Sequence, residues 1–219
     1  FCLIKQKIFI RVIIKRWHFA SIPFIMKFFW ADFHQSFSIL HFFINQKPTI
    51  VEGLKYAQEK IQGSMSILLL FPDRIYASRD KYGRTPIIVG KSKNGYCVTF
   101  ESSAYQNLGF SYVKDLGPGE IVSITNKELV VESKPNQCMQ MCSFLWSYYG
   151  YTTATYEGHN VEVMRYQCGE LLRKRDLIEA DAVAGVPDSG VPHAIGYANE
   201  AHIPYIRPFV KYTPTWPRS

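Results

Sequence analysis

The chain has 219 residues, of which 47% are hydrophobic and 15% aromatic, and it carries a formal net charge of +7. This length is enough for one or two domains with a buried core. The odd count of five cysteines, without a secretory signal, favours reduced thiols and a cytoplasmic location over a disulfide-stabilised secreted domain.

Residues 1–47 differ in composition from the rest. They hold seven basic side chains against one acidic, a net of +6, and ten of the fifteen phenylalanines, so the remainder has no basic face for nucleic acid. The segment shows no helical or strand period and starts at Phe1. We therefore expect a fragment whose first 47 residues are a mistranslated or misjoined segment outside the ordered domain. Its longest weakly charged run, 17–26, is too short to span a membrane, and an amphipathic membrane anchor is the alternative.

The first regular element follows Lys47. Residues Thr49 to Glu52 form a capping box, which predicts a helix start. Apolar side chains at helical spacing then predict a buried face that ends before Gly63. The members of this face are Ile50, Leu54, Ala57 and Ile61.

Strand patterns alternate with turn residues up to residue 131. Residues 65–71 and 75–78 flank a Pro-Asp turn, 87–90 and 97–100 flank Asn94-Gly95, and 120–124 and 129–131 flank Asn126. Consecutive short strands with such turns predict an antiparallel meander. We interpret Asp80 and Gly83 as turn residues and Glu101 as a solvated carboxylate.

The last third alternates between strands and helices. The aromatic run 143–151 predicts a linking strand, and Asn160 can cap a following helix. We expect a strand at 182–186, a helix at 191–200 and a strand at 203–210, which together make a βαβ unit with a parallel pair. In the helix after Asn160, the expected buried face comprises Met164, Cys168, Leu171 and Leu172, and the basic residues 173–175 close its last turn.

The connection at residues 187–190 reads Pro-Asp-Ser-Gly, and Pro192 stands near the following helix start, where a missing N–H costs nothing. The N–H groups of such a loop and the helix dipole together favour an anion, usually a phosphate. The alternative is an ordinary strand-to-helix connection in which Asp188 or Ser189 is the N-cap.

Several separated motifs occur in one collinear order: RDKYGRTPI at 79–87, FESSA at 100–104, DLGPGEI at 115–121 and VPDSG at 186–190. Their order resembles the amidophosphoribosyltransferase family, glutamine-dependent enzymes that commit phosphoribosyl pyrophosphate (PRPP) to purine synthesis. The resemblance implies an α+β part followed by an α/β part. Residues 48–140 would be the C-terminal part of an Ntn-hydrolase-type glutaminase αββα domain, and 141–219 the start of a type I phosphoribosyltransferase domain.

The resemblance also implies roles for particular residues. The loop would cradle pyrophosphate through Asp188, Ser189 and Gly190, with Ser189 approaching Mg²⁺. Residues 211–219 correspond to a flap that closes over PRPP, and Lys211 and Arg218 would contact its phosphates. Some family members hold a [4Fe–4S] cluster, which would make Cys142 an iron–sulfur ligand in the full-length protein. The alternative is a buried free thiol.

Glutaminase chemistry is not expected from the chain as given. The family's nucleophile is a cysteine at the mature N-terminus whose α-amino group is the base, and Cys2, in an apolar run, is no substitute. The stretch 35–41 matches a family segment whose two acidic positions are Gln35 and Phe37 here, which puts glutamine binding in doubt. We expect no catalytic residue in this chain.

In full length, the resemblance implies a homo-oligomer that converts glutamine, PRPP and water to 5-phosphoribosylamine, glutamate and pyrophosphate, with neither a nucleic-acid nor a membrane partner. Two alternatives come from other classes of protein. One is a non-catalytic scaffold or binding protein that keeps the fold without its sites. The other is a membrane-associated interaction protein that uses residues 1–47.

Overall fold

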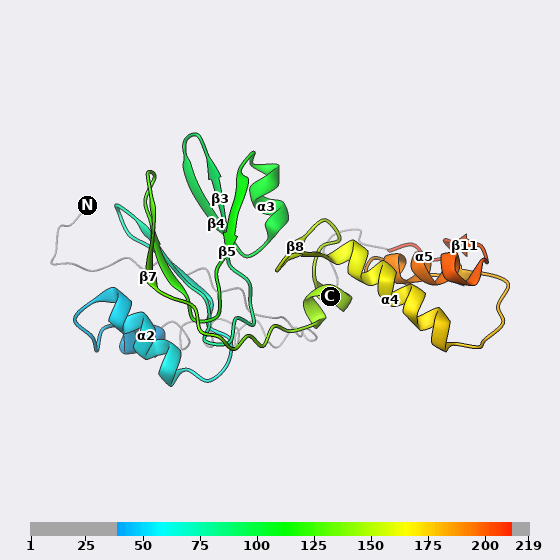
Figure 1. Ribbon diagram of the computed structural model, residues 1–219, viewed down its shortest axis with the longest axis horizontal. Coiled ribbons are helices and arrows are strands. Elements are labelled where there is room, and N and C mark those ends of the chain that lie inside the picture. The colour runs from blue at the N-terminus through cyan, green and yellow to red at the C-terminus, as the bar shows by residue number, and fades with distance from the viewer. Residues whose placement is uncertain (1–38, 212–219) are drawn as a thin grey trace. The chain divides into compact units, whose positions relative to one another are not determined.

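The computed structural model describes residues 39–211, which form two compact units that divide between Met141 and Cys142 (Figure 1). Cys2, Gln35, Phe37 and Arg218 lie outside the described residues. Each unit has its own helices and strands, and each is described by itself below.

Unit 1 contains two antiparallel sheets. One is four-stranded, in the order β1 (Ile67–Leu70), β2 (Ile75–Ser78), β6 (Ile121–Ile124) and β7 (Leu129–Ser133). The other is three-stranded, in the order β4 (Gly95–Thr99), β3 (Ile88–Ser92) and β5 (Ser111–Asp115). The expected hairpins are confirmed, but the single meander is wrong, because the chain leaves the first sheet after β2 and returns to it only at β6.

Two apolar cores order the layers of unit 1. Strand residues alternate between faces, so Ile121 packs toward the helices of the first core while Val122 packs toward the other sheet. Helix α2 (Ile50–Lys60) covers the first sheet, and α3 (Ser102–Asn107) lies against the outer face of the second, where a Cβ at Gly90 would lie 3.2 Å from that of Tyr105. The layers therefore run helix, sheet, sheet, helix.

The expectation that residues 1–47 lie outside the domain is wrong for its last part. Residues 39–44 are helical, and Leu40 and Ile44 are 3% and 2% exposed in the same core as Leu54 of α2. These side chains are buried because they cover the apolar face of the first sheet together with α2. Their composition resembles that of the segment before them, so composition alone did not separate them from it.

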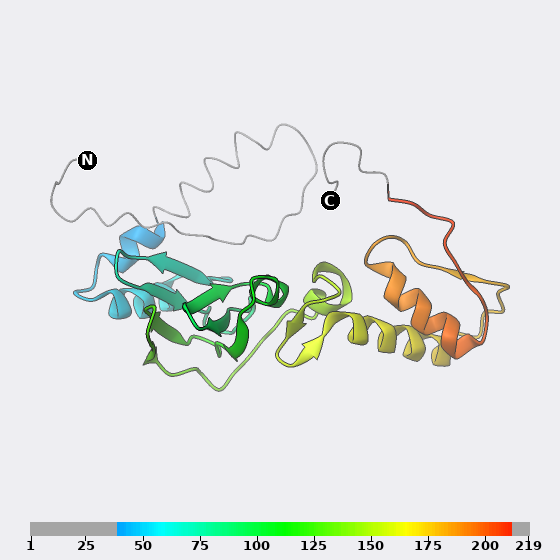
Figure 2. The same cartoon turned by 90° about the horizontal axis from the view of Figure 1, so that it is seen from above.

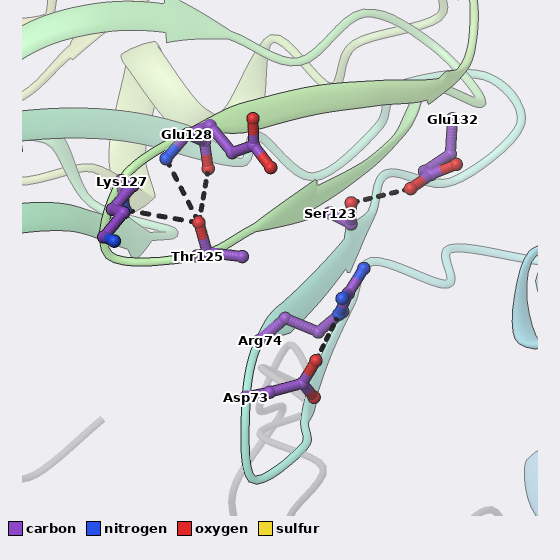
Figure 3. Close-up of polar contacts among 7 residues, drawn as sticks. All are labelled: Asp73, Arg74, Ser123, Thr125, Lys127, Glu128 and Glu132. Atoms are coloured by element: carbon purple, nitrogen blue, oxygen red, sulfur yellow. Dashed lines mark hydrogen bonds and ion pairs between the residues drawn. The ribbon is translucent and has the colours of Figure 1, made fainter.

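Local turn and cap chemistry behaves as the sequence indicates. Thr49 caps α2, with its Oγ accepting from the Glu52 N–H at 3.2 Å. At the β6–β7 turn, the Thr125 Oγ accepts from the N–H groups of Lys127 and Glu128 (Figure 3). At the β1–β2 turn, Arg74 Nε donates to Asp73 at 2.8 Å.

Unit 2 is built on two helices that lie side by side, α4 (Val161–Arg175) and α5 (Gly190–Ala201) (Figure 2). Strands β10 (Val183–Ala184) and β11 (Tyr205–Ile206) form the expected parallel pair around α5. A short hairpin of β8 (Thr155–Tyr156) and β9 (His159–Asn160) precedes α4. Asn160 caps α4 as predicted, accepting from the Val163 N–H at 3.1 Å.

Two expectations for unit 2 are wrong. Leu145–Tyr149 form a π-helical turn, η1, in place of a linking strand, because the turn closes on itself through the Gly150 N–H, which donates to the Leu145 carbonyl at 2.7 Å. The face of α4 that is buried contains Val161, Arg165 and Gly169, whereas Leu171 and Leu172 are exposed. Close packing on α5 selects this face, because Gly169 lies against the His193 backbone.

Candidate functional site

The loop between β10 and α5 is a tight turn that only a glycine permits. A Cβ on the buried Gly185 would lie 2.7 Å from Val191 Cα, so the chain can fold back on the helix start only without one. The Gly190 N–H donates to the Val186 carbonyl at 2.9 Å, and the Val191 N–H donates to the Asp188 carbonyl at 3.3 Å. The loop thus satisfies the N–H groups of the first two helix residues.

Further donors at this loop remain available. Within residues 39–211, the N–H groups of Asp188 and Ser189 and the Ser189 hydroxyl have no hydrogen-bond partner. Ser189 occupies the N-cap position of α5, but its side chain makes no capping bond. The ordinary-cap alternative is therefore not supported, and the free donors stand at the helix N-terminus, where the dipole favours an anion.

Lys211 brings a positive charge to the loop. Its Nζ lies 2.9 Å from Asp188 Oδ2, and the two side chains are 45% and 74% exposed. The hydrogen bond to Asp188 and the attraction of its charge raise the pKa of Lys211. Four of the predicted residues, Asp188, Ser189, Gly190 and Lys211, are thus brought together although Lys211 is distant in sequence.

Two residues that the sequence analysis did not single out hold η1 against the helices of unit 2. Arg165, only 2% exposed, donates through Nε to the Trp146 carbonyl at 2.7 Å and through a terminal nitrogen to the Gly150 carbonyl at 2.8 Å. Burial lowers the pKa of Arg165. His193, in the first turn of α5, lies 3.0 Å through Nε2 from the Ser147 carbonyl. The sequence shows a histidine in the first turn of this helix, but its partner, Ser147, lies 46 residues away, so the sequence did not reveal the contact.

The loop offers two oxygen groups of the kind that Mg²⁺ shares with a substrate, but it forms no complete metal site by itself. Asp188 supplies a carboxylate and Ser189 a hydroxyl that has no partner within residues 39–211, and Mg²⁺ usually completes such a pair with water and substrate phosphates. Cys142 is exposed, not buried as the free-thiol alternative held. No three His, Cys, Asp or Glu side chains of residues 39–211 gather to hold a metal, so Cys142 as an iron–sulfur ligand of the full-length protein stays a prediction.

The RDKYGRTPI motif of unit 1 forms a buried polar network. Asp80, 1% exposed, accepts from the Tyr82 N–H at 3.0 Å, the Thr85 N–H at 3.2 Å and the Ser64 hydroxyl at 3.2 Å. Arg79 is fully buried and donates to the carbonyls of Gly83, at 2.6 Å, and Leu116. These contacts close the 79–85 turn, so the turn interpretation of Asp80 and Gly83 is confirmed.

The fold and the loop define a class: a mixed α/β protein whose second unit presents free N–H donors and a lysine at a strand-to-helix connection. Within residues 39–211, none of the helices is long and apolar enough to cross a membrane. Comparison with protein-family models gave no match. Comparison with individual proteins gave several matches.

The chain is similar in sequence to curated amidophosphoribosyltransferases. It is 32% identical over 174 residues to that enzyme of Archaeoglobus fulgidus and 34% identical over 187 residues to that of Staphylococcus aureus, covering 79% and 83% of this chain. It spans 38% of the length of each of these two relatives.

Two solved structures are also similar to this chain. The glutamine PRPP amidotransferase of B. subtilis, complexed with ADP and GMP, superimposes with a TM-score of 0.72 at 27% identity over 77% of this chain and 38% of its own. A structure described as the allosteric regulatory enzyme of purine biosynthesis gives a TM-score of 0.73 at 26% identity, over 82% of this chain and 40% of its own.

Proposed function

We propose that the chain is part of an amidophosphoribosyltransferase, which uses glutamine and PRPP to make 5-phosphoribosylamine, glutamate and pyrophosphate at the first committed step of purine synthesis. Homology over about four fifths of the chain supports this proposal. The observation that carries it within the chain is the loop 186–190, where free donors, an exposed carboxylate and a lysine converge.

The two units would serve the two half-reactions. The helix, sheet, sheet, helix layering of unit 1 supports an Ntn-hydrolase-type glutaminase domain at residues 48–140. The βαβ arrangement of unit 2 supports the start of a type I phosphoribosyltransferase domain at residues 141–219. The scaffold alternative is not favoured, because the Ser189 side chain does not cap α5 and the N–H donors of the loop stay free within residues 39–211.

In this reaction the loop would bind the pyrophosphate that leaves. Its N–H groups at Asp188 and Ser189 would donate to phosphate oxygens, and the dipole of α5 would add a favourable field. The Ser189 hydroxyl and the Asp188 carboxylate would face Mg²⁺, which supplies charge neutralisation as the bond to the anomeric carbon breaks. Such preorganised donors favour the charge that builds up on the leaving group.

Titration calorimetry with magnesium pyrophosphate tests the proposal. We expect binding by the full chain that requires Mg²⁺ and is weak, with a dissociation constant on the order of 1 mM, or about −4 kcal/mol. Ser189→Ala should weaken it severalfold with an unchanged melting temperature, because the side chain caps nothing. The matched control is Ser143→Ala, at an exposed serine of the same unit. Equal binding by Ser189→Ala and wild type would show that the loop is only a turn.

A further inference from the structure

Unit 1 has a surface hollow that the proposed function does not use. The hollow measures about 340 Å³, within the size range of small-molecule sites, and it lies where the connection before α2 meets the exposed side of that helix. Its lining members from α2 recur at intervals of one helical turn, so they share one side of the helix. The lining residues are Lys47, Pro48, Glu52, Lys55, Tyr56 and Glu59.

Two ammonium groups share the Tyr56 ring at this hollow. The Nζ of Lys47 lies 4.6 Å from the ring centroid and that of Lys60 lies 5.5 Å from it, both within the range of cation–π contacts. The Phe43 ring packs against the same tyrosine in a T-shaped arrangement at 5.8 Å between centroids. Lys55 adds a third ammonium group to the lining. Because like charges repel each other, this arrangement favours the approach of an anion.

The neighbouring carboxylates do not neutralise the three lysines. Within residues 39–211 the three form no ion pair, although Glu52 and Glu59 stand one helical turn from Lys55. Glu52 instead accepts the Thr49 hydroxyl at 3.0 Å as part of the capping box. The hollow therefore combines unpaired ammonium groups with an aromatic ring that is held in place.

We propose that this hollow binds a phosphate monoester carried on a planar ring. Such a group brings about two negative charges at neutral pH and three acceptor oxygens, which suits several ammonium donors better than a single carboxylate does. The planar ring of the ligand would lie against Tyr56. The inference does not rest on the proposed function, because the hollow belongs to unit 1 and shares no residue with the loop 186–190.

Titration calorimetry of the full chain with phenyl phosphate tests the inference. The buffer contains EDTA, which removes the Mg²⁺ that binding at the loop 186–190 would require. Lys47→Gln and Lys55→Gln should each weaken binding about threefold to tenfold, since each loses one charge-assisted partner of the phosphate. Glu59→Gln removes a negative charge from the hollow and should tighten binding. No measurable binding by wild type, or equal binding by wild type and both lysine variants, would overturn the inference.

Methyl phosphate separates the contribution of the ring from that of the charge. Wild type should bind it several times more weakly than phenyl phosphate, because the methyl group cannot lie against Tyr56 as a ring does. Tyr56→Phe keeps the aromatic ring and its packing on Phe43, so it should keep this preference, whereas Tyr56→Leu should lose it. Equal binding of the two phosphates by wild type would refute recognition of a ring.

A matched control is available in the same unit. Lys91 is an exposed lysine whose Nζ lies 5.0 Å from the Tyr96 ring centroid, outside the hollow. Lys91→Gln removes the same charge and the same type of contact, so it should bind phenyl phosphate as wild type does. Weakening equal to that of Lys47→Gln would reduce the effect to net charge and refute a site.

Covalent labelling locates the bound anion directly. Pyridoxal 5′-phosphate joins a phosphate monoester to a planar ring with an aldehyde, which condenses with a lysine amine to an imine and releases water. Borohydride then reduces the imine to a stable amine. Mass spectrometry of peptides should find Lys47 or Lys55 labelled ahead of Lys91, with protection by excess phenyl phosphate. Equal labelling of all three, or labelling that phenyl phosphate does not reduce, would contradict the inference.

Ser189→Ala distinguishes this inference from the proposed function. It should leave the affinity for phenyl phosphate in EDTA unchanged, because Ser189 lies in the loop of unit 2. If Ser189→Ala weakens phenyl phosphate and the lysine variants do not, the anion binds at the loop and the hollow is refuted while the proposed function stands. If the lysine variants weaken phenyl phosphate and no chain binds magnesium pyrophosphate, the hollow stands and the proposed function falls.

Discussion

Asp80 shows how a motif residue can be structural. Its carboxylate is almost completely buried and accepts three hydrogen bonds, two of them from N–H groups of the turn it closes. The neighbouring Gly83 has φ +67°, where a side chain is strained, so the turn depends on both residues. The sequence identified the turn because the two N–H partners of Asp80 lie within five residues of it, but it did not reveal the burial.

Replacing Asp80 should therefore destabilise unit 1. Asp80→Ala removes the acceptor of the Tyr82 and Thr85 N–H groups, whereas the exposed Ser64 hydroxyl keeps the Thr85 hydroxyl as a partner, so we expect a cost of about 2–4 kcal/mol of the free energy of unfolding. Urea unfolding followed by circular dichroism measures it, with Asp181→Ala as control, since Asp181 is exposed and has no hydrogen-bond partner within residues 39–211. A loss below about 1 kcal/mol would mean that water replaces the carboxylate.

At the scale of elements, the crossing of α4 and α5 determines unit 2. A Cβ on Gly169 would lie 2.0 Å from the His193 carbonyl oxygen, and one on Gly196 would lie 2.1 Å from that of Tyr166. Each helix thus presents a glycine to the backbone of the other. This close approach buries the Gly169 face of α4 and leaves Leu171 and Leu172 exposed, the reverse of what hydrophobic periodicity predicted.

The sign of the stability change in a glycine-to-alanine variant tests this crossing. On an isolated helix, alanine is the better helix former by about 1 kcal/mol, so Gly169→Ala would stabilise α4. Overpacking against the His193 backbone costs about 1–3 kcal/mol, so we expect net destabilisation, and the same for Gly196→Ala. Gln167→Ala, at an exposed position of α4, is the control and should not destabilise. A higher melting temperature for both glycine variants would refute the close crossing.

Across the whole molecule, each unit holds a carboxylate whose pKa is lowered by its hydrogen bonds. The hydrogen bond from Arg74 lowers the pKa of Asp73 in unit 1. In unit 2, the Ile178 N–H and then the Tyr197 hydroxyl, at 2.9 Å, lower the pKa of Asp176. A carboxyl whose pKa is depressed by folding stabilises the fold above its unfolded value, near 3.8, and this contribution is lost as pH falls through the folded value.

Acid should therefore weaken the chain below about pH 4. The sharpest measurement is the difference in melting temperature between wild type and Asp176→Asn, which should be positive at pH 6 and shrink toward zero at pH 3. Asp181→Asn, at an exposed carboxylate outside any described pair, should show no such convergence. A difference independent of pH would show that Asp176 acts through packing and not through its charge.

What the sequence determined by itself is local. The caps at Thr49 and Asn160, the hairpin turns, and the strand, loop and helix around 187–190 follow from contacts within a few residues, and each of them is present in the fold. The collinear motifs also indicated the resemblance to the amidophosphoribosyltransferases, because the residue types and the order of the motifs can be read from the sequence without any knowledge of the packing.

Tertiary structure decided the rest. Local patterns do not report on partners far along the chain. Such partners determine which strands share a sheet, which face of α4 is buried and whether residues 39–44 join the core. The site shows the same division. The loop could be predicted from five consecutive residues. The pairing of Lys211 with Asp188 joins side chains 23 residues apart, and only the folded backbone brings their charges together.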